Sequence, residues 1–595
     1  MSLPAREKYA GETRRLLLAF DIGTTFSGIS YSILDPGNVP EIRPVTRYPF
    51  QEQAGGNSKI PTVIYYDLNG TVAAIGAETL KDGIEADAEE LGWSKARWFK
   101  LHLRPKPAVS SRANAQVEVP LPPLPPNKTV VNVFADYMEY LHSCAKKYIS
   151  ETHGHPFWTS LEDDIMYVLT HPNGWGGPQQ AQMREAALRA GFIPNTDEGR
   201  SRVTFVTEGE ASLHFCLSNG LTIEGAGESS GVLIVDAGGG TIDLTAYSKL
   251  PDHSFEEIAI PQCHFQGAAY VTMRAERYFT ALLGRSRFAQ DIKELTTRFD
   301  RTTKHVFQSE DEPLHIQFTS HRERDPALNI RAGRLTLEGR NVATFFEPSV
   351  SCIVDAIEEQ ISSSYKSIKT VFLVGGFSAS NWLYEQVRER TARLGVTLSR
   401  PDTHVNKAVS NGAVSFYLDS AVTSRVSRLT YGIKTYVRYD PTNVEHRNRS
   451  HRTSIHPALG VPILICRFYP ILHKNTRVKA TSEFRQTFHY EGVTRGELNR
   501  AVESILSYCG PSTNPEWIDE DTDNLYPSVC VVEADTSSVQ STIKTSASGL
   551  QYHEINFDVI LLFGLTELKA QIAYIQNGVE RRGRAQVVYR ASELV

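Results

Sequence analysis

Residues 16–26, LLLAFDIGTTF, and residues 232–243, VLIVDAGGGTID, are two copies of one pattern: an apolar run, an aspartate, and a Gly/Thr-rich turn into a second strand. Each copy predicts a buried strand that turns tightly into its neighbour, with glycine where a Cβ would block a ligand. Backbone N–H groups in such a turn bind phosphate oxygens, and Thr hydroxyls add donors. One copy alone fits an ordinary glycine-containing hairpin equally well, but the pair favours a nucleotide-binding cleft.

The aspartates of the two copies, Asp21 and Asp236, predict a metal ion. Two carboxylates that face one polyphosphate repel it unless a cation lies between them. Mg²⁺ fits this role because it takes hard oxygen ligands and keeps several waters that carboxylates hold. We therefore expect Asp21 and Asp236 to hold a hydrated Mg²⁺.

A third motif lies at residues 371–378, VFLVGGFS, and a helical segment follows at 381–393. Its paired glycines, Gly375 and Gly376, separate a strand from a helix N-terminus, where a flat adenosine can lie against the main chain. By itself this motif also fits a tight strand–helix connection in any α/β protein.

In this order the three motifs resemble those of the superfamily of actin, sugar kinases and heat-shock ATPases, and their details resemble its heat shock protein 70 branch. The resemblance covers residues 16–424, and outside the motifs it rests on segments 167–172, 181–192, 205–211 and 405–413. It implies an α/β fold: a two-lobed actin-like ATPase domain built from duplicated ribonuclease-H-like subdomains.

The resemblance also implies a site for ATP or ADP with Mg²⁺. The residues implied in catalysis are Lys100, Glu208, Asp236 and Thr241. Those implied to bind the nucleotide are Gly23, Thr24, Thr25, Phe26, Gly238, Gly239, Gly240, Lys304, Gly375, Gly376, Phe377 and Asn406. The metal is implied at Asp21 and Asp236. Lys95 is the alternative to Lys100 as the lysine near the γ-phosphate, and an ordinary surface lysine is the remaining alternative.

The adenine side departs from the family pattern. Ala379 stands where the family stacks an arginine on the base, and His305 stands where a second arginine follows Lys304. Residues 266–269, QGAA, lack the family's acidic residue. Because a planar guanidinium contributes more over a base than alanine does, we expect weaker nucleotide binding. His305 fits an ordinary surface histidine as well as a stacking one.

The composition is that of a soluble globular protein with several folding units: 595 residues, 41% hydrophobic and 22% charged. A formal net charge of −6 gives no overall attraction to nucleic acid or to an anionic membrane. Seven dispersed cysteines without a C-x-x-C pair predict reduced thiols. Neither a signal peptide nor a membrane span is expected. We therefore expect a cytoplasmic protein, with the nucleus as the alternative.

Four parts are expected along the chain: a loose tail at 1–13, the ATPase domain at 14–424, a linker at 425–429 and a β-rich domain at 430–595. The proline-rich insert at 103–128 predicts an extended surface loop within the ATPase domain. The alternative is a ligand for a partner that binds polyproline helices.

The β-rich domain resembles, more faintly, the peptide-binding β-sandwich of heat shock protein 70, in segments 429–435, 472–478 and 565–589. We expect it without the helical lid that closes over peptide in those chaperones. The connector carries Arg425 and Arg428 where the chaperones have an apolar linker. Because burying unpaired charge is costly, the connector predicts weak coupling between the domains.

These features favour a divergent chaperone-like ATPase that hydrolyses ATP slowly, with extended or unfolded peptide segments and cochaperones as partners. A nucleotide-sensing scaffold with little hydrolysis is the first alternative. A small-molecule kinase of the same superfamily is the second, and the β-rich domain and the lack of a recognisable sugar pocket disfavour it.

Overall fold

The computed structural model describes residues 6–51, 59–105, 121–219, 230–400, 408–479, 481–519, 525–563, 567–583 and 585–587. Asn406 and residues 106–120 of the proline-rich insert lie outside the described residues. The chain divides into two compact units. Unit 1 comprises Met1–Arg104, Val117–Trp175 and Gln182–Val422, and unit 2 comprises Pro105–Gln116, Gly176–Ala181 and Thr423–Val595.

The first sheet of unit 1 contains the Asp21 motif. Its strand order is β3 (Arg43–Pro44), β2 (Phe26–Leu34), β1 (Arg15–Ile22), β8 (Met166–His171) and β9 (Val203–Thr207), with β4 (Ile60–Pro61) paired to β2. β1 and β2 are antiparallel, whereas β8 runs parallel to β1 and β9 parallel to β8. After its first residue β1 is buried throughout, as its apolar run predicts.

The second sheet contains the other two motifs. Its strand order is β18 (Thr397–Ser399), β17 (Ser367–Val374), β10 (Ser230–Ala237), β11 (Ile242–Lys249) and β12 (Phe255–Glu257), with β13 (Gln262–His264) paired to β11. β10 and β11 are antiparallel, and β17 runs parallel to β10. Each aspartate motif therefore lies at the turn of an antiparallel hairpin whose first strand has a parallel neighbour.

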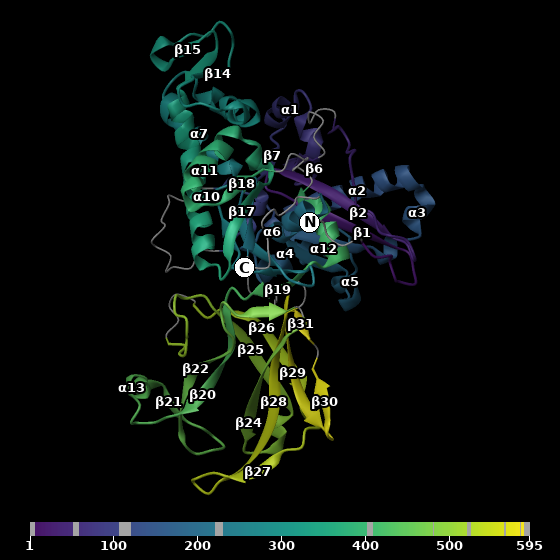
Figure 1. The fold of residues 1–595 in the computed structure, drawn as a ribbon, viewed down its shortest axis with the longest axis vertical. Coiled ribbons are helices and arrows are strands. Elements are labelled where there is room, and N and C mark those ends of the chain that lie inside the picture. Colours follow the sequence, from purple (N-terminus) through teal and green to yellow (C-terminus); the bar gives the residue numbers. More distant parts are fainter. Residues whose placement is uncertain are drawn as a thin grey trace. The chain divides into compact units, whose positions relative to one another are not determined.

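Helices cover these sheets. Their bounds are α1 (Ile84–Glu90), α2 (Val130–His153), α3 (His155–Thr159), α4 (Gly177–Arg189), α5 (Asp197–Ser201), α6 (Glu208–Ser218), α7 (Ala268–Leu283), α8 (Ile292–Arg298), α9 (Lys304–Val306), α10 (Gly339–Ser363), α11 (Asn381–Thr391) and α12 (Ala408–Asp419). α10 packs on β10 and β11 and beside α7 and α11 (Figure 1). α6 and α12 pack against each other, α6 on β10 and α12 on β1, so this helix pair connects the two sheets.

Two smaller sheets and one irregular helix complete unit 1. The sheets have the orders β6 (Val72–Ile75), β5 (Val63–Tyr66), β7 (Ser94–Arg97) and β14 (Leu314–Gln317), β16 (Arg334–Leu337), β15 (Ile330–Arg331). A π-helical turn, Phe299–Thr303, lies between α8 and α9. Separate apolar cores lie against the β1 sheet and the β10 sheet.

Unit 2 consists mainly of two sheets that share an apolar cluster. The first has the order β21 (Thr453–Ile455), β22 (Pro462–Leu472), β20 (Thr430–Arg438), β25 (Arg500–Tyr508), β26 (Ser528–Asp535). The second has the order β24 (Glu483–Gly492), β28 (Gln551–Phe563), β29 (Leu568–Gln576), β30 (Val579–Arg582), with β27 (Thr542–Thr545) on β28 and β31 (Gln586–Val587) on β29. Ile433 and Ile505 of the first sheet share a buried cluster with Val559 and Ile572 of the second. A short helix, α13 (Val444–Asn448), also belongs to this unit.

One expectation about the chain's connections is wrong. The tail is not loose at its described residues, because the Arg6 guanidinium donates two hydrogen bonds, of 2.7 and 2.8 Å, to Asp419. Within the predicted linker, Arg425 and Val426 belong to β19 (Val422–Val426), which pairs with β23 (Arg477–Lys479). In both cases the partner is distant in sequence, so local composition does not reveal it.

Among the described residues, no helix is long and apolar enough to cross a membrane. All seven cysteines are free thiols, and Cys144, Cys216, Cys466 and Cys530 are buried. These are the free thiols that the sequence predicts.

Candidate functional site

The turn between β10 and β11 directs three backbone N–H groups to one side. The carbonyls of residues 238–240 accept hydrogen bonds from the N–H groups of residues 267–269, at distances between 2.7 and 3.2 Å. In a trans peptide the N–H points away from the C=O, and the described residues contain no cis bond. The N–H groups of residues 239–241 therefore point away from residues 267–269, and no acceptor in the described part of the chain occupies them. Three such donors in succession can bind an anion.

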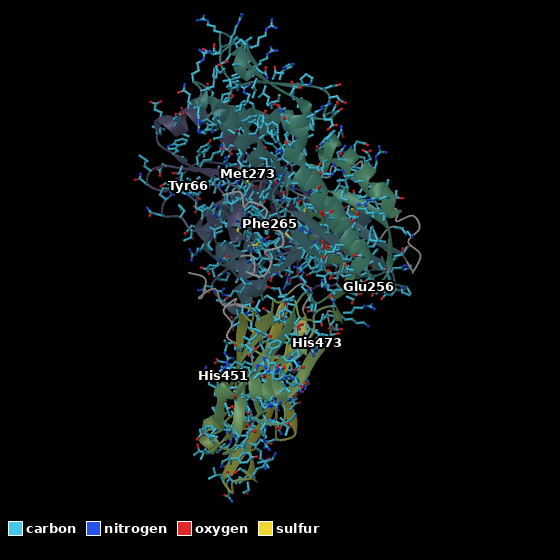
Figure 2. The ribbon with its side chains drawn as sticks, turned by 90° about the vertical axis from the view of Figure 1, so that its left-hand side faces the viewer. Tyr66, Glu256, Phe265, Met273, His451 and His473 are labelled. Carbon is cyan, nitrogen blue, oxygen red and sulfur yellow. The ribbon has the colours of Figure 1, made fainter. Side chains whose placement is uncertain are left out.

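A small apolar cluster supports the loop that holds this turn. It includes Trp98, Leu101 and Met273, and Phe265 packs against it. Figure 2 labels Met273 and Phe265. Because α7 begins at Ala268, the loop is continuous with a helix whose first turn belongs to the same cluster. The direction of the three N–H groups is thus fixed by packing as well as by hydrogen bonds.

The two aspartate-motif turns lie against each other. A Cβ on Gly239 would overlap the Thr25 side chain, and a Cβ on Gly240 would overlap that of Thr24. Glycine at both positions allows this close approach. The structure therefore brings the two threonine hydroxyls next to the three N–H groups.

The paired-glycine motif meets the same site at Asp236. Gly375 has a φ of 85°, and a Cβ there would overlap Oδ1 of Asp236. Gly376 has open space around its Cα instead. Only glycine adopts this conformation at Gly375 without strain, so the end of β17 depends on it.

Four acidic side chains are buried within electrostatic reach of one another. Asp21, Glu208, Asp236 and Asp243 are 3, 8, 4 and 0% exposed, and the charges of Asp21 and Glu208 both act on Asp236. Asp243 is the member that sequence reasoning missed. It ends the second quoted motif, but nothing in the motif's spacing distinguishes it from an ordinary strand residue.

Two lysines neutralise two of these carboxylates. Lys100, which is 2% exposed, forms an ion pair of 2.5 Å with Glu208. Lys59 forms an ion pair of 2.6 Å with Asp21, and no sequence signal pointed to it. The alternative lysine, Lys95, instead pairs with Glu85 at 3.5 Å.

The remaining two carboxylates have no lysine partner among the described residues. Burial and the charge of Glu208 raise the pKa of Asp236 to about 7, although a 2.7 Å hydrogen bond from Ser212 opposes the shift. Burial also raises the pKa of Asp243. Burial opposes the charge on Lys100, but Glu208 and Asp21 outweigh it and raise the pKa of that ammonium. The site thus keeps the Lys100 ammonium charged and holds two carboxylates without an ion-pair partner among the described residues.

The hydrogen bonds of Asp243 leave one oxygen available. Oδ1 accepts a 2.6 Å hydrogen bond from the backbone N–H of Asn173. Oδ2 is buried and has no hydrogen-bond partner in the described part of the structure. An unpartnered buried carboxylate oxygen calls for a ligand, a water or an ion.

These observations fit a hydrated Mg²⁺ with a polyphosphate. No three His, Cys, Asp or Glu side chains within the described ranges converge as a direct metal site. Mg²⁺ suits this arrangement, since it commonly keeps its waters and is held by one or two carboxylates together with phosphates. Asp236 and Asp243 are the carboxylates left to hold it, because Asp21 and Glu208 already pair with lysines.

The residues predicted on the adenine side are engaged in internal contacts. The Lys304 ammonium is buried and contacts Asp300 and, at 3.1 Å, the Thr272 hydroxyl. The Phe377 ring packs on Phe346 in the core, so only its backbone is left for a ligand. Burial lowers the pKa of His305, which favours a neutral imidazole. Phe26, by contrast, is 44% exposed at the start of β2.

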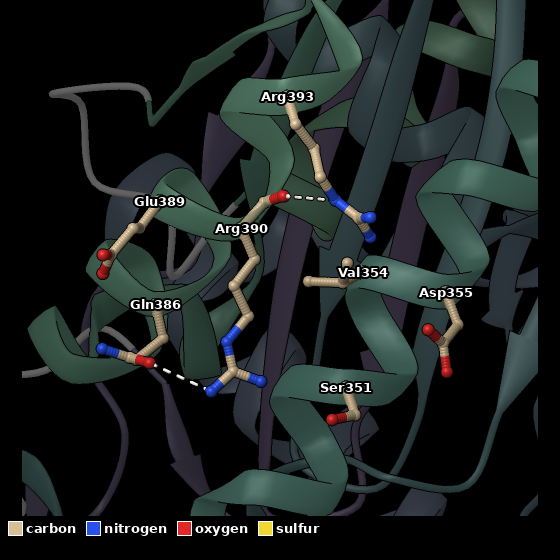
Figure 3. A pocket seen from close by; sticks show the side chains of 7 residues that line it. All are labelled: Ser351, Val354, Asp355, Gln386, Glu389, Arg390 and Arg393. Carbon is tan, nitrogen blue, oxygen red and sulfur yellow. Dashed lines mark hydrogen bonds between the residues drawn. The ribbon is translucent and has the colours of Figure 1, made fainter.

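A separate hollow of about 560 Å³ lies between α10 and α11 (Figure 3). Arg390 donates to Gln386 and forms ion pairs with Glu347, and Arg393 pairs with Glu358. Because its arginines already have acidic partners, this hollow is a poorer anion site than the turn at residues 238–240.

Comparison with known proteins identifies relatives across most of the chain. Mouse heat shock 70 kDa protein 12A is 23% identical over 510 residues, which cover 72% of this chain and 73% of that protein. The human 12A protein is 23% identical over 506 residues (71% and 72%), and human heat shock 70 kDa protein 12B is 23% identical over 509 residues (72% and 72%). No protein-family model matches the chain. The mixed α/β architecture with several sheets is consistent with an actin-like ATPase fold. At 23% identity over about 72% of the chain, these similarities support a divergent member of the heat shock protein 70 family.

Proposed function

We propose that this protein binds ATP and ADP with Mg²⁺ between the turns at residues 23–26 and 238–241, and hydrolyses ATP slowly. The observation that carries the proposal is the set of three parallel N–H groups at residues 239–241, beside the hydroxyls of Thr24 and Thr25. Such donors suit phosphate oxygens, and phosphoryl transfer depends mainly on positioning and charge neutralisation.

The residues of the proposed site have different roles. The N–H groups of residues 239–241 and the threonine hydroxyls bind and orient the β- and γ-phosphates. Lys100, held by Glu208, places a positive charge where charge develops during transfer. The free Oδ2 of Asp243 accepts a hydrogen bond from the attacking water. A bound Mg²⁺ would supply further neutralisation of the phosphates.

The nucleotide-binding domain in this proposal comprises residues 14–424, with duplicated ribonuclease-H-like halves. Residues 430–595 form a β-domain that holds extended peptide, and cochaperones are further partners, in the cytoplasm. The matching hairpins of β1–β2 and β10–β11 support the first part. The shared core of two sheets in unit 2 supports the second.

A nucleotide-sensing scaffold is the second candidate. The contact between Lys304 and Asp300, together with Ala379 in place of a stacking arginine, favours weak binding of the base. Measuring phosphate release with and without unfolded peptide separates this scaffold from a working chaperone, and adding candidate sugars tests for a kinase.

Calorimetric titration of the full chain with ATP, with and without Mg²⁺, tests nucleotide binding itself. Gly239→Ala should abolish or strongly weaken binding, because its Cβ meets Thr25, whereas Gly496→Ala has open space and serves as the control. ATP binding that is equal in the two variants, at matched folding, contradicts the proposed site.

A further inference from the structure

The ion pair between Lys59 and Asp21 lies within the proposed phosphate site. The two side chains are 17 and 4% exposed, and Nζ lies 2.6 Å from Oδ2. Oδ1 of the same carboxylate accepts a 3.3 Å hydrogen bond from Thr170. Asp21 therefore has a cationic partner before any metal binds.

The fold builds this pair across a strand. Asp21 on β1 lies opposite Gly28 on β2, and Lys59 immediately precedes β4, which pairs with the start of β2. A Cβ on Gly28 would lie 3.4 Å from Cγ of Lys59. The lysine stem thus crosses β2 over a glycine and reaches the aspartate on the next strand.

The Lys59–Asp21 ion pair changes how much negative charge in the site is left for a metal to neutralise. Of the four buried carboxylates, Asp21 and Glu208 have lysine partners, while Asp236 and Asp243 have none among the described residues. An ammonium within hydrogen-bond distance of a carboxylate occupies the position that a cation would otherwise take. A divalent metal is then needed to neutralise only part of the negative charge of the four carboxylates.

We propose that Lys59 is a tethered cation of the phosphate site, which occupies Asp21 in place of a metal and makes nucleotide binding less dependent on Mg²⁺. Lys59 is a positioning residue in this view, and the divalent cation is left to Asp236 and Asp243. The statement about nucleotide binding rests on the proposed function. The statement that Lys59 keeps a metal from Asp21 can be tested without nucleotide.

The first test titrates the nucleotide-free full chain with Mn²⁺, a spectroscopic substitute for Mg²⁺, by calorimetry and electron paramagnetic resonance. Lys59→Met exposes the Asp21 carboxylate, so its Mn²⁺ affinity should rise by about tenfold or more. Lys59→Arg should respond as the wild type does. Lys128→Met is the matched control, because Lys128 forms a similar part-buried ion pair, 2.8 Å long, with Asp136.

The second test compares the Kd for ADP in Mg²⁺ with that in EDTA. The ratio should be about tenfold larger in Lys59→Met than in the wild type. A double variant, Asp21→Asn with Lys59→Met, removes both charges of the pair, adds no uncompensated buried charge and should fold, yet it should gain no Mn²⁺ affinity. A Lys59→Met chain that folds only with Mn²⁺ supports the proposal equally.

An unchanged Mn²⁺ affinity in folded Lys59→Met overturns the tethered-cation role, and so does an equal gain in the double variant. If the wild type binds neither ATP nor ADP in Mg²⁺, the proposed function fails instead. The Mn²⁺ titration still decides the role of Lys59 in that case.

Discussion

Replacing Asp236 by asparagine should stabilise unit 1 at neutral pH and remove its response to Mg²⁺. The carboxylate is buried beside Glu208 and lacks a lysine partner among the described residues. Asparagine keeps the shape and an oxygen that accepts the Ser212 hydrogen bond, but it carries no charge to desolvate.

The magnitude follows from the pKa of Asp236, which burial raises from 3.8 to about 7. Because the folded pKa is the higher one, the unfolded chain loses its proton first as the pH rises. The stability of the metal-free wild type therefore falls between pH 4 and pH 7, and the full cost above pH 7 is about 4 kcal/mol. The advantage of Asp236→Asn should grow by about 3 kcal/mol between pH 5 and pH 8.

Hydrogen exchange of the β10 amides in EDTA measures the free energy of opening of this unit without interference from unit 2. Asp87→Asn, on the exposed face of α1, is the control. Adding Mg²⁺ should stabilise the wild type and leave Asp236→Asn unchanged. If Asp236→Asn is more stable than the wild type by the same free energy at pH 5 and at pH 8, the reasoning is refuted, because the stability of the site would then not depend on the titration of Asp236.

Three further outcomes are expected. Lys100→Met should lower kcat for ATP hydrolysis more than it lowers ATP affinity, because the ammonium acts where charge moves during transfer, whereas Lys95→Met should change neither quantity. If single-turnover kinetics show the loss of kcat in Lys95→Met and not in Lys100→Met, Lys95 is the lysine near the γ-phosphate. Gly375→Ala should destabilise unit 1 by about 2 kcal/mol more than Gly37→Ala in urea unfolding, because both positions have a positive φ but only the first meets Asp236. An equal cost at both positions would assign the effect to φ alone. Release of a labelled peptide should differ less than about tenfold between the ATP and ADP states in stopped-flow measurements, because charged Arg425 makes a poor apolar linker; a larger acceleration by ATP would contradict weak coupling.

The sequence predicts those parts of the site whose residues are adjacent in the chain. The aspartate motifs specify their hairpins locally, because an apolar run followed by glycine and threonine leaves few other conformations. Lys59 and Asp243 could not be chosen in advance. The role of Lys59 depends on β4 pairing with β2, and that of Asp243 on the backbone of Asn173, 70 residues away.

On the adenine side, too, the sequence does not show which distant residues a side chain contacts. Lys304 matches a family position by spacing, but its contact with Thr272 depends on how α7 packs against the π-helical turn before α9. Arg6 is a similar case, since its partner, Asp419, lies at the other end of unit 1 in sequence. A single sequence shows neither partner, because side-chain pairing across the fold leaves no periodic pattern.

The loop at residues 267–269 holds the phosphate turn through its backbone N–H groups, and this has an evolutionary consequence. Any residue except proline supplies such a group, so the partly exposed side chain at Ala268 is free to change without altering the donors at 239–241. Ala269 and Gly267 are the exceptions, because Ala269 is buried in the cluster around Trp98 and a Cβ on Gly267 would overlap the backbone of Gly240. Sequence identity at these positions therefore understates how much of the anion-binding geometry distant relatives retain.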